Sequence, residues 1–187
     1  AVETTSGVAG VQLYRRHGRS GFGVRARAAR DSKEWNVAAY SCKCYSNASE
    51  VCSRSCQGWV CAAKKRDAHA CGRLIDDIVA AVQQSLAVGI TEVHMVGGLH
   101  PTLKKDWYRT LLQRVRSLDP NLIIKAFTAI EIRHLAQRIF KQPIADTLAV
   151  LRDAGLGALT GGGAEIFDAN VRDELCRGKE SAEEWLD

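Results

Sequence analysis

Hydrophobic residues recur at helical spacing only in the second part of the chain. Three such stretches cover residues 74–86, 107–118 and the surroundings of 148–151, and they predict amphipathic helices. Two short apolar runs, residues 90–96 and 121–127, lie between these stretches. Their length and the turn-forming residues beside them predict buried strands.

Two further elements extend this pattern. Thr128 is followed three residues later by Glu131, a capping box that predicts the start of another helix. Residues 157–160, "GALT", predict a third strand. Strands that alternate with helices about every thirty residues are typical of βαβ units in a parallel sheet. The sequence therefore predicts an α/β fold, either an open doubly wound sheet or a βα barrel.

The loops after the predicted strands carry the candidate binding residues. These loops are "GGLHP", "TAIEI" and "TGGGAEI", and in both architectures ligands bind at the carboxyl ends of the strands. Glycine lets backbone groups approach a ligand, which makes Gly97 and Gly98 candidates, together with His100 and Glu165. The chain has no G-x-G-x-x-G or Walker sequence, which argues against a Rossmann or P-loop site.

Each candidate also has a purely structural interpretation. The glycine pair can form a tight turn, and His100, which precedes a proline, can belong to the same turn. Glu131 can serve only as the acid of the capping box. His94 lies within a predicted strand, where a histidine is more often a satisfied core residue than a ligand.

The first 73 residues differ from the rest in pattern and charge. They hold 13 Lys and Arg against 5 Asp and Glu, whereas residues 74–187 hold 13 against 16. Apolar periodicity predicts at most a frayed helix over residues 24–30. We divide the chain into a poorly patterned N-terminal segment, residues 1–51, and a second part, residues 52–187, that contains the regularly patterned elements. A basic segment can bind nucleic acid, but no nucleic-acid motif with interleaved aromatic residues accompanies the charge.

Composition is that of an ordinary globular protein. The chain has 187 residues, of which 46% are hydrophobic and 25% charged, which is enough for one domain with a sizeable core. It contains no run of eighteen apolar residues, so we expect no membrane span. We also expect a cytoplasmic protein, since no signal-peptide pattern is visible. The first residue is not Met and the chain stops within a predicted helix, "SAEEWLD", so we expect a fragment.

Cysteines cluster in the basic part of the chain. Six of the seven lie between residues 42 and 71, which without a secretion signal favours metal ligation or redox chemistry over disulfides. The paired C-x₂-C units of a zinc site are absent. Cys52 and Cys56 instead form C-x₃-C, and Cys61 follows. This spacing opens the C-x₃-C-x₂-C motif of a [4Fe–4S] cluster whose fourth iron binds S-adenosylmethionine.

Four stretches resemble a known enzyme family. They are "EVHMVGGLHP", "IKAFTAIEI", "LRDAGLGALTGGGAEIF" and "VRDELCRGKESAEEWLD", and they are similar to aminofutalosine synthase, a radical S-adenosylmethionine enzyme of the futalosine route to menaquinone. The likeness is nearly unbroken from about residue 60 to 187 and would cover roughly the first half of the family's chain. The resemblance implies a partial (βα)₆ radical-enzyme barrel, which is TIM-barrel-like, and residues 52–187 would be the first half of this barrel domain.

The resemblance implies roles for individual residues. Cys52 and Cys56 would be cluster ligands. The register set by "AAKKRDAHA" places Trp59 at the family's third cysteine position, which leaves Cys61 as the candidate third ligand. The implied S-adenosylmethionine-binding residues are Gly97, Gly98 and Glu165. The implied substrate-binding residues are His100, Thr128 and Glu131.

The resemblance also implies a reaction. The 5′-deoxyadenosyl radical would add to 3-[(1-carboxyvinyl)oxy]benzoate, and the product would be 6-amino-6-deoxyfutalosine. An electron donor such as flavodoxin or ferredoxin would be the protein partner, and no nucleic-acid partner is expected. The alternatives are the sister cyclic dehypoxanthinyl futalosine synthase, a catalytically inactive barrel fragment, and a Cys-rich zinc or nucleic-acid-binding protein.

Overall fold

The chain consists of two units. The computed structural model describes residues 19–34, 40–49, 51–53, 74–162, 164–175 and 179–186, and contacts divide the chain into Ala1–Tyr40 and Ser41–Asp187. The helix described in the first unit is α2 (Arg19–Glu34). This helix is longer than the predicted one over residues 24–30. All other described elements belong to the second unit.

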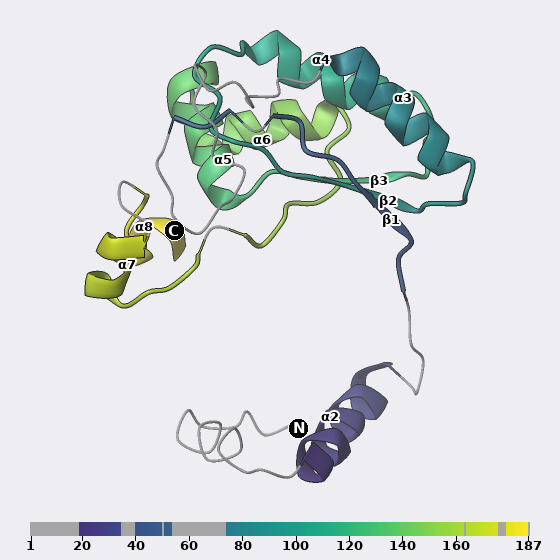
Figure 1. Ribbon diagram of the computed structural model, residues 1–187, viewed down its shortest axis with the longest axis vertical. Coiled ribbons are helices and arrows are strands. Elements are labelled where there is room, and N and C mark those ends of the chain that lie inside the picture. Colours follow the sequence, from purple (N-terminus) through teal and green to yellow (C-terminus); the bar gives the residue numbers. More distant parts are fainter. Residues whose placement is uncertain are drawn as a thin grey trace. The chain divides into compact units, whose positions relative to one another are not determined.

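A three-stranded parallel sheet forms the centre of the second unit (Figure 1). The strands, hydrogen-bonded in this order, are β1 (Lys43–Tyr45), β2 (Glu92–Met95) and β3 (Ile123–Ala126). The second and third strands confirm the two apolar runs as strands. The first strand lies in the segment described above as poorly patterned and was not predicted. Its three residues pair in parallel register with the start of β2.

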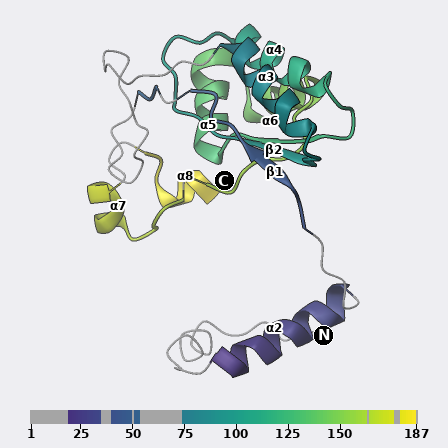
Figure 2. The ribbon, with the colours of Figure 1, turned by 45° about the vertical axis from the view of Figure 1, so that its right-hand side comes forward.

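Helices cover one face of this sheet (Figures 1 and 2). In chain order they are α3 (Ile75–Leu86), α4 (Lys105–Arg116), α5 (Ala129–His134), the π-helix η1 (Leu135–Phe140) and α6 (Ile144–Asp153). They confirm the predicted helices, and α5 begins at the predicted capping box. Two short helices follow, α7 (Ala169–Leu175) and α8 (Ala182–Leu186). None of the helices in the described ranges is long and apolar enough to cross a membrane.

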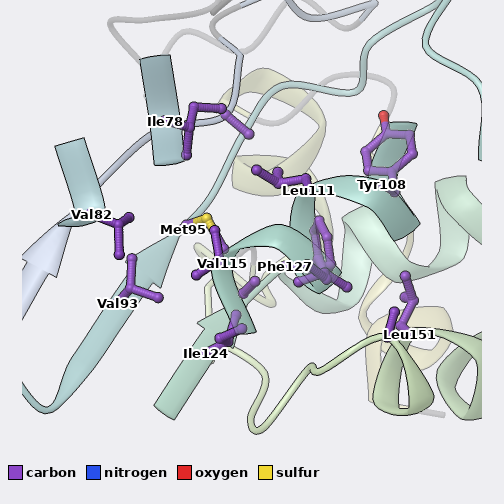
Figure 3. Close-up of a cluster of buried hydrophobic side chains, with 14 of the residues drawn as sticks. Ile78, Val82, Val93, Met95, Tyr108, Leu111, Val115, Ile124, Phe127 and Leu151 are labelled. Carbon is purple, nitrogen blue, oxygen red and sulfur yellow. The ribbon is translucent and has the colours of Figure 1, made fainter. Parts of the chain in front are cut away.

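The hydrophobic core lies between the sheet and these helices (Figure 3). Val93 and Met95 of β2 and Ile124 of β3 are at most 2% exposed. They pack against the inner sides of three helices, whose labelled core residues are Ile78, Val82, Leu111, Val115 and Leu151. The periodic apolar positions of the sequence thus form the core, as amphipathic patterns predict.

The prediction of a strand over the whole of residues 157–160 is wrong. The chain there makes one isolated parallel bridge, between Lys125 and Ala158. Gly157 N–H donates to the Ile124 carbonyl at 2.8 Å, and Ala126 N–H donates to the Ala158 carbonyl at 3.0 Å. The segment therefore begins to extend the sheet beside β3 but forms no ladder within the described residues.

Candidate active site at the strand ends

The loops after β1 and β2 lie side by side at the carboxyl ends of their strands. Gly98 N–H donates to the Ser49 carbonyl at 2.9 Å, and Ser53 N–H donates to the Leu99 carbonyl at 3.0 Å. A Cβ on Gly98 would lie 2.2 Å from the Val51 carbonyl oxygen, which no real side chain can do. Glycine at this position is therefore required by the close approach of the neighbouring loop.

Glu131 joins the loop after β2 to the loop after β3. Its Oε1 accepts a hydrogen bond from Gly97 N–H at 2.9 Å, and its Oε2 accepts one from Thr128 N–H at 2.8 Å. The Thr128 hydroxyl accepts from Glu131 N–H at 3.2 Å, which completes the predicted capping box. Glu131 thus caps α5 and also holds the glycine loop of the adjacent strand.

Burial changes the acidity of this carboxyl group. Glu131 is only 8% exposed. Burial raises the pKa of Glu131 to about 7, against the opposing effect of the hydrogen bonds from Thr128 and Gly97. A carboxyl group with this pKa exchanges its proton near neutral pH, which is a common property of functional sites.

Residues 160–162 contact the loop after β3, which contains Thr128. Thr160 donates to the Phe127 carbonyl twice, from its N–H at 2.9 Å and from its hydroxyl at 3.0 Å. A Cβ on Gly162 would lie 3.1 Å from the methyl group of Thr128. The glycine pair, the capping box and the start of the glycine triplet, expected at one edge of the sheet, therefore do lie together. We call this edge the rim.

Cys52 lies beside the rim. It is 6% exposed and packs with Leu99 and Ile130 in a small apolar cluster, against which Trp185 also packs. It takes part in no disulfide. Because ligands of parallel βα folds bind at the carboxyl ends of strands, this thiol stands at the correct end to ligate a metal cluster.

The other predicted iron ligands, Cys56 and Cys61, lie outside the described residues, as does Trp59. Within the described ranges, no group of three His, Cys, Asp or Glu side chains could hold a metal ion. Of the three predicted ligands, the structure therefore describes only Cys52. Its position at the rim is the observation that makes it suitable as a cluster ligand.

His100 has the turn role that the sequence left as its alternative. Its Nδ1 accepts hydrogen bonds from the N–H groups of Thr102 and Leu103, both at 3.2 Å. A ring nitrogen that accepts carries no proton, so this bonding pattern requires Nδ1 to be unprotonated. A substrate contact of His100 remains a prediction.

Glu165 pairs with a lysine in the structure. Its Oε1 accepts from Lys179 Nζ at 2.8 Å, and its backbone has a φ of 55°, in the left-handed region. Nearby, Arg172 is 6% exposed and donates to the carbonyls of Ile166 at 2.8 Å and Glu180 at 2.7 Å. The predicted contact of Glu165 with the cofactor remains a prediction, and it would have to coexist with this ion pair.

The last described helix packs near the rim. Glu184 of α8 pairs with Arg133 of α5 at 2.7 Å, and the ring of Trp185 lies 5.8 Å from that of Phe167. Since Trp185 also contacts the apolar cluster around Cys52, α8 covers one side of this cysteine.

Sequence reasoning missed the residues of the loop after β1. Ser49 is 4% exposed, and its hydroxyl oxygen accepts from Val51 N–H at 3.1 Å. The side-chain oxygen of Asn47 is buried and has no hydrogen-bond partner among the described residues. The Ser49 carbonyl also accepts from Gly98 N–H, a contact that depends on the pairing of β1 with β2 and that no local pattern predicts.

Comparison with known proteins identifies relatives along most of the chain. No family model matches it. It is 34% identical over 176 residues to aminodeoxyfutalosine synthase of Streptomyces coelicolor, a match that covers 94% of this chain and 45% of that enzyme. It is 40% identical over 113 residues to aminodeoxyfutalosine synthase of Thermus thermophilus, which covers 60% of this chain and 30% of that enzyme. Cyclic dehypoxanthine futalosine synthase of Halalkalibacterium halodurans is 32% identical over 142 residues, or 75% of this chain and 38% of that enzyme.

A solved structure supports the fold independently. Methylornithine synthase superimposes with a TM-score of 0.71 at 18% identity, over 98% of this chain and 51% of that protein. The chain spans less than half the length of the curated relatives that it matches. The predicted partial βα barrel is confirmed, and so is the resemblance: over the part that it spans, this chain is a relative of aminodeoxyfutalosine (aminofutalosine) synthase.

Proposed function

We propose that the chain supplies part of the barrel of a radical S-adenosylmethionine transferase of menaquinone biosynthesis, an aminodeoxyfutalosine synthase. The reaction would join the 5′-deoxyadenosyl group to 3-[(1-carboxyvinyl)oxy]benzoate and give 6-amino-6-deoxyfutalosine. The observation that carries the proposal is the packing of Cys52 beside the Gly97–Gly98 loop, at the rim that also holds Glu131. The identity to named relatives supports it.

The proposed cluster ligands are Cys52, Cys56 and Cys61. A [4Fe–4S] cluster held by them would supply the electron that cleaves S-adenosylmethionine. Flavodoxin or ferredoxin is the proposed source of that electron. The chain's own contribution at Cys52 is a thiol held in an apolar environment by Leu99 and Ile130, next to the glycine loop.

The glycine loop would bind the methionyl part of the cofactor through its carbonyl groups. The N–H of Gly97 donates to Glu131, and the N–H of Gly98 donates to Ser49. The carbonyl oxygens are therefore the backbone groups that the two glycines can offer, and they suit an ammonium group, which only donates. Glu131 would keep this loop in place, and the Thr128 hydroxyl could donate to a substrate at the same rim.

Iron binding and product formation test the proposal. The full chain would be reconstituted anaerobically with iron and sulfide, and iron, sulfide and the electron-spin signal would be measured. We expect about four iron atoms per chain and a signal that S-adenosylmethionine alters. Cys52→Ser should lose most of the iron, whereas Cys42→Ser should keep it, because Cys42 is exposed and precedes β1 at the opposite end of the sheet.

Turnover would separate the two futalosine-pathway synthases from an inactive barrel fragment. With dithionite, S-adenosylmethionine and 3-[(1-carboxyvinyl)oxy]benzoate, mass spectrometry should detect 6-amino-6-deoxyfutalosine. Consumption of dehypoxanthine futalosine instead would favour the sister enzyme, to which the chain is also similar. A chain that binds no iron, or that binds iron but converts neither substrate, would be an inactive barrel fragment.

A further inference from the structure

A row of three polar side chains crosses the sheet. Tyr45 of β1 is paired with His94 of β2, and His94 is paired with Lys125 of β3. Residues paired in a parallel sheet point to the same face, and neighbours along a strand point to opposite faces. The strand neighbours Val93 and Ile124 are fully buried beneath the helices. The row therefore lies on the other face, which is turned away from α3, α4 and α6 in Figures 1 and 2.

This position corrects the expectation that His94 is a satisfied core histidine. His94 is half-buried, and its Nδ1 is enclosed without a hydrogen-bond partner among the described residues. Its ring contacts that of Tyr45, with centroids 5.3 Å apart and a tilt of 34°. Because Nδ1 is enclosed, a ligand on the open face would meet the other ring nitrogen, Nε2, which is not among the enclosed atoms without a partner in the described residues.

Positive charge predominates around His94. Burial is the largest cause that lowers the pKa of His94. The ammonium groups of Lys43 and Lys125 lower this pKa further, whereas the carboxylate of Glu92 raises it. Among the described residues, these are the charged groups that act on this histidine. Lys125 takes part in none of the ion pairs found in the described ranges. Two ammonium groups against one carboxylate, around this imidazole, favour binding of an anion.

We propose that Tyr45, His94 and Lys125 form the floor of the ligand site and bind the carboxylate of an aromatic acid. Lys125 pairs with the carboxylate, and His94 donates a second hydrogen bond to it. The paired rings of Tyr45 and His94 supply an aromatic surface for the ring of the acid. The choice of an aromatic acid rests on the proposed function, because the proposed substrate is a benzoate with a second carboxylate.

The row lies beneath the rim. His94 comes three residues before Gly97 in the chain, about 10 Å along a parallel strand. A ligand on the row would therefore lie below the loops at which the cofactor is proposed to bind. This arrangement places substrate and cofactor one above the other on the same face of the barrel wall.

Equilibrium dialysis of labelled benzoate against the full chain tests the inference. Wild type should bind benzoate at least about tenfold more tightly than neutral benzamide. Lys125→Met should lose this preference, Lys125→Arg should keep most of it, and Lys104→Met, which removes an exposed lysine beside α4, should match wild type. Equal affinity of wild type and Lys125→Met for benzoate would overturn the inference, as would wild type that fails to prefer benzoate.

A titration by nuclear magnetic resonance gives a second readout on the wild-type chain. The ring C–H signals of His94, assigned with His94→Gln, should show a pKa that rises when benzoate is added, because a nearby carboxylate stabilises the protonated ring. An unchanged pKa under saturating benzoate would overturn the inference even if Lys125→Met does not fold. A chain without iron but with Lys125-dependent binding would contradict only the proposed function. A chain that forms the product but binds benzoate independently of Lys125 would contradict only this inference.

Discussion

The two faces of the central sheet differ completely, although the same three strands form both. On the helix-covered face, Val93 and Ile124 are fully buried and Met95 is 2% exposed. On the other face, Tyr45 is 58% exposed and Ile123 46% exposed, and charged residues flank them. The difference indicates that the two faces have different roles. The covered face supplies the apolar burial that stabilises the unit, so the open face can carry polar groups at little cost in stability.

The largest expected change in stability comes from comparing one substitution on each face of the sheet. Ile124→Ala should lower the free energy of unfolding by about 4 kcal/mol, because it removes a fully buried side chain and leaves a cavity. Lys125→Met, at the next position on the opposite face, should change it by less than about 1 kcal/mol. Urea unfolding followed by circular dichroism measures both. Similar losses for the two variants would show that the open face is in fact packed.

The rim is polar and yet buried. The titration of Glu131 shows how burial of a polar group there affects the stability of the fold. The pKa of Glu131 is raised from 4.5 to about 7 in the folded chain, so folding favours the protonated form. The associated stability is present below about pH 4.5 and is lost as the pH rises through about 7, a change of about 3 kcal/mol for a shift of this size. Urea midpoints between pH 4 and 8 should show this decline.

The decline should be absent in Glu131→Gln, whose side chain does not titrate. Asp106→Asn, at a largely exposed carboxylate of α4, should leave the decline as in wild type. A wild-type midpoint that is flat across this pH range would contradict the assigned burial of Glu131.

The glycine loop provides a smaller effect. Gly98→Ala should destabilise the chain by about 2 kcal/mol, because the new Cβ meets the Val51 carbonyl and the two loops must separate. Gly161→Ala is the matched control, since a Cβ there meets nothing within 4 Å. Thermal unfolding measures the difference. Equal melting temperatures for the two variants would mean that the loops after β1 and β2 do not pack as described.

The smallest effect concerns the cap of α5. Thr128→Ala should cost about 1 kcal/mol, because Glu131 N–H loses its acceptor. Thr128→Ser keeps the hydroxyl and should remain within about 0.5 kcal/mol of wild type. Urea unfolding of the pair would show whether the capping box contributes beyond the methyl group of Thr128. If Thr128→Ala lowered the free energy of unfolding as much as Ile124→Ala does, the loss of one capping hydrogen bond could not explain it.

Much of the fold followed from local pattern. The strands β2 and β3 were predictable because short apolar runs between turns are typical of buried strands. The capping box at Thr128 and Glu131 was predictable because its reciprocal hydrogen bonds join residues only three positions apart. The gathering of loops at the rim followed from parallel topology, in which all strands end at the same edge.

Other features depend on contacts between distant segments. The strand β1 has only three residues, and its pairing with β2, about fifty residues later, distinguishes it from the loop around it. The hydrogen bond from Gly97 to Glu131 joins residues 34 positions apart. Residues 157–160 begin beside β3 but do not continue as a strand, an outcome that their local composition did not indicate.

The sequence by itself determined the α/β class, most of the helices and two of the strands, because periodic burial is a local property of the chain. Only the tertiary structure decided that Tyr45, His94 and Lys125, spread over eighty residues of sequence, stand in one row. The reason is that register comes from backbone hydrogen bonds between strands, and a shift by one residue would send each of these side chains to the opposite face.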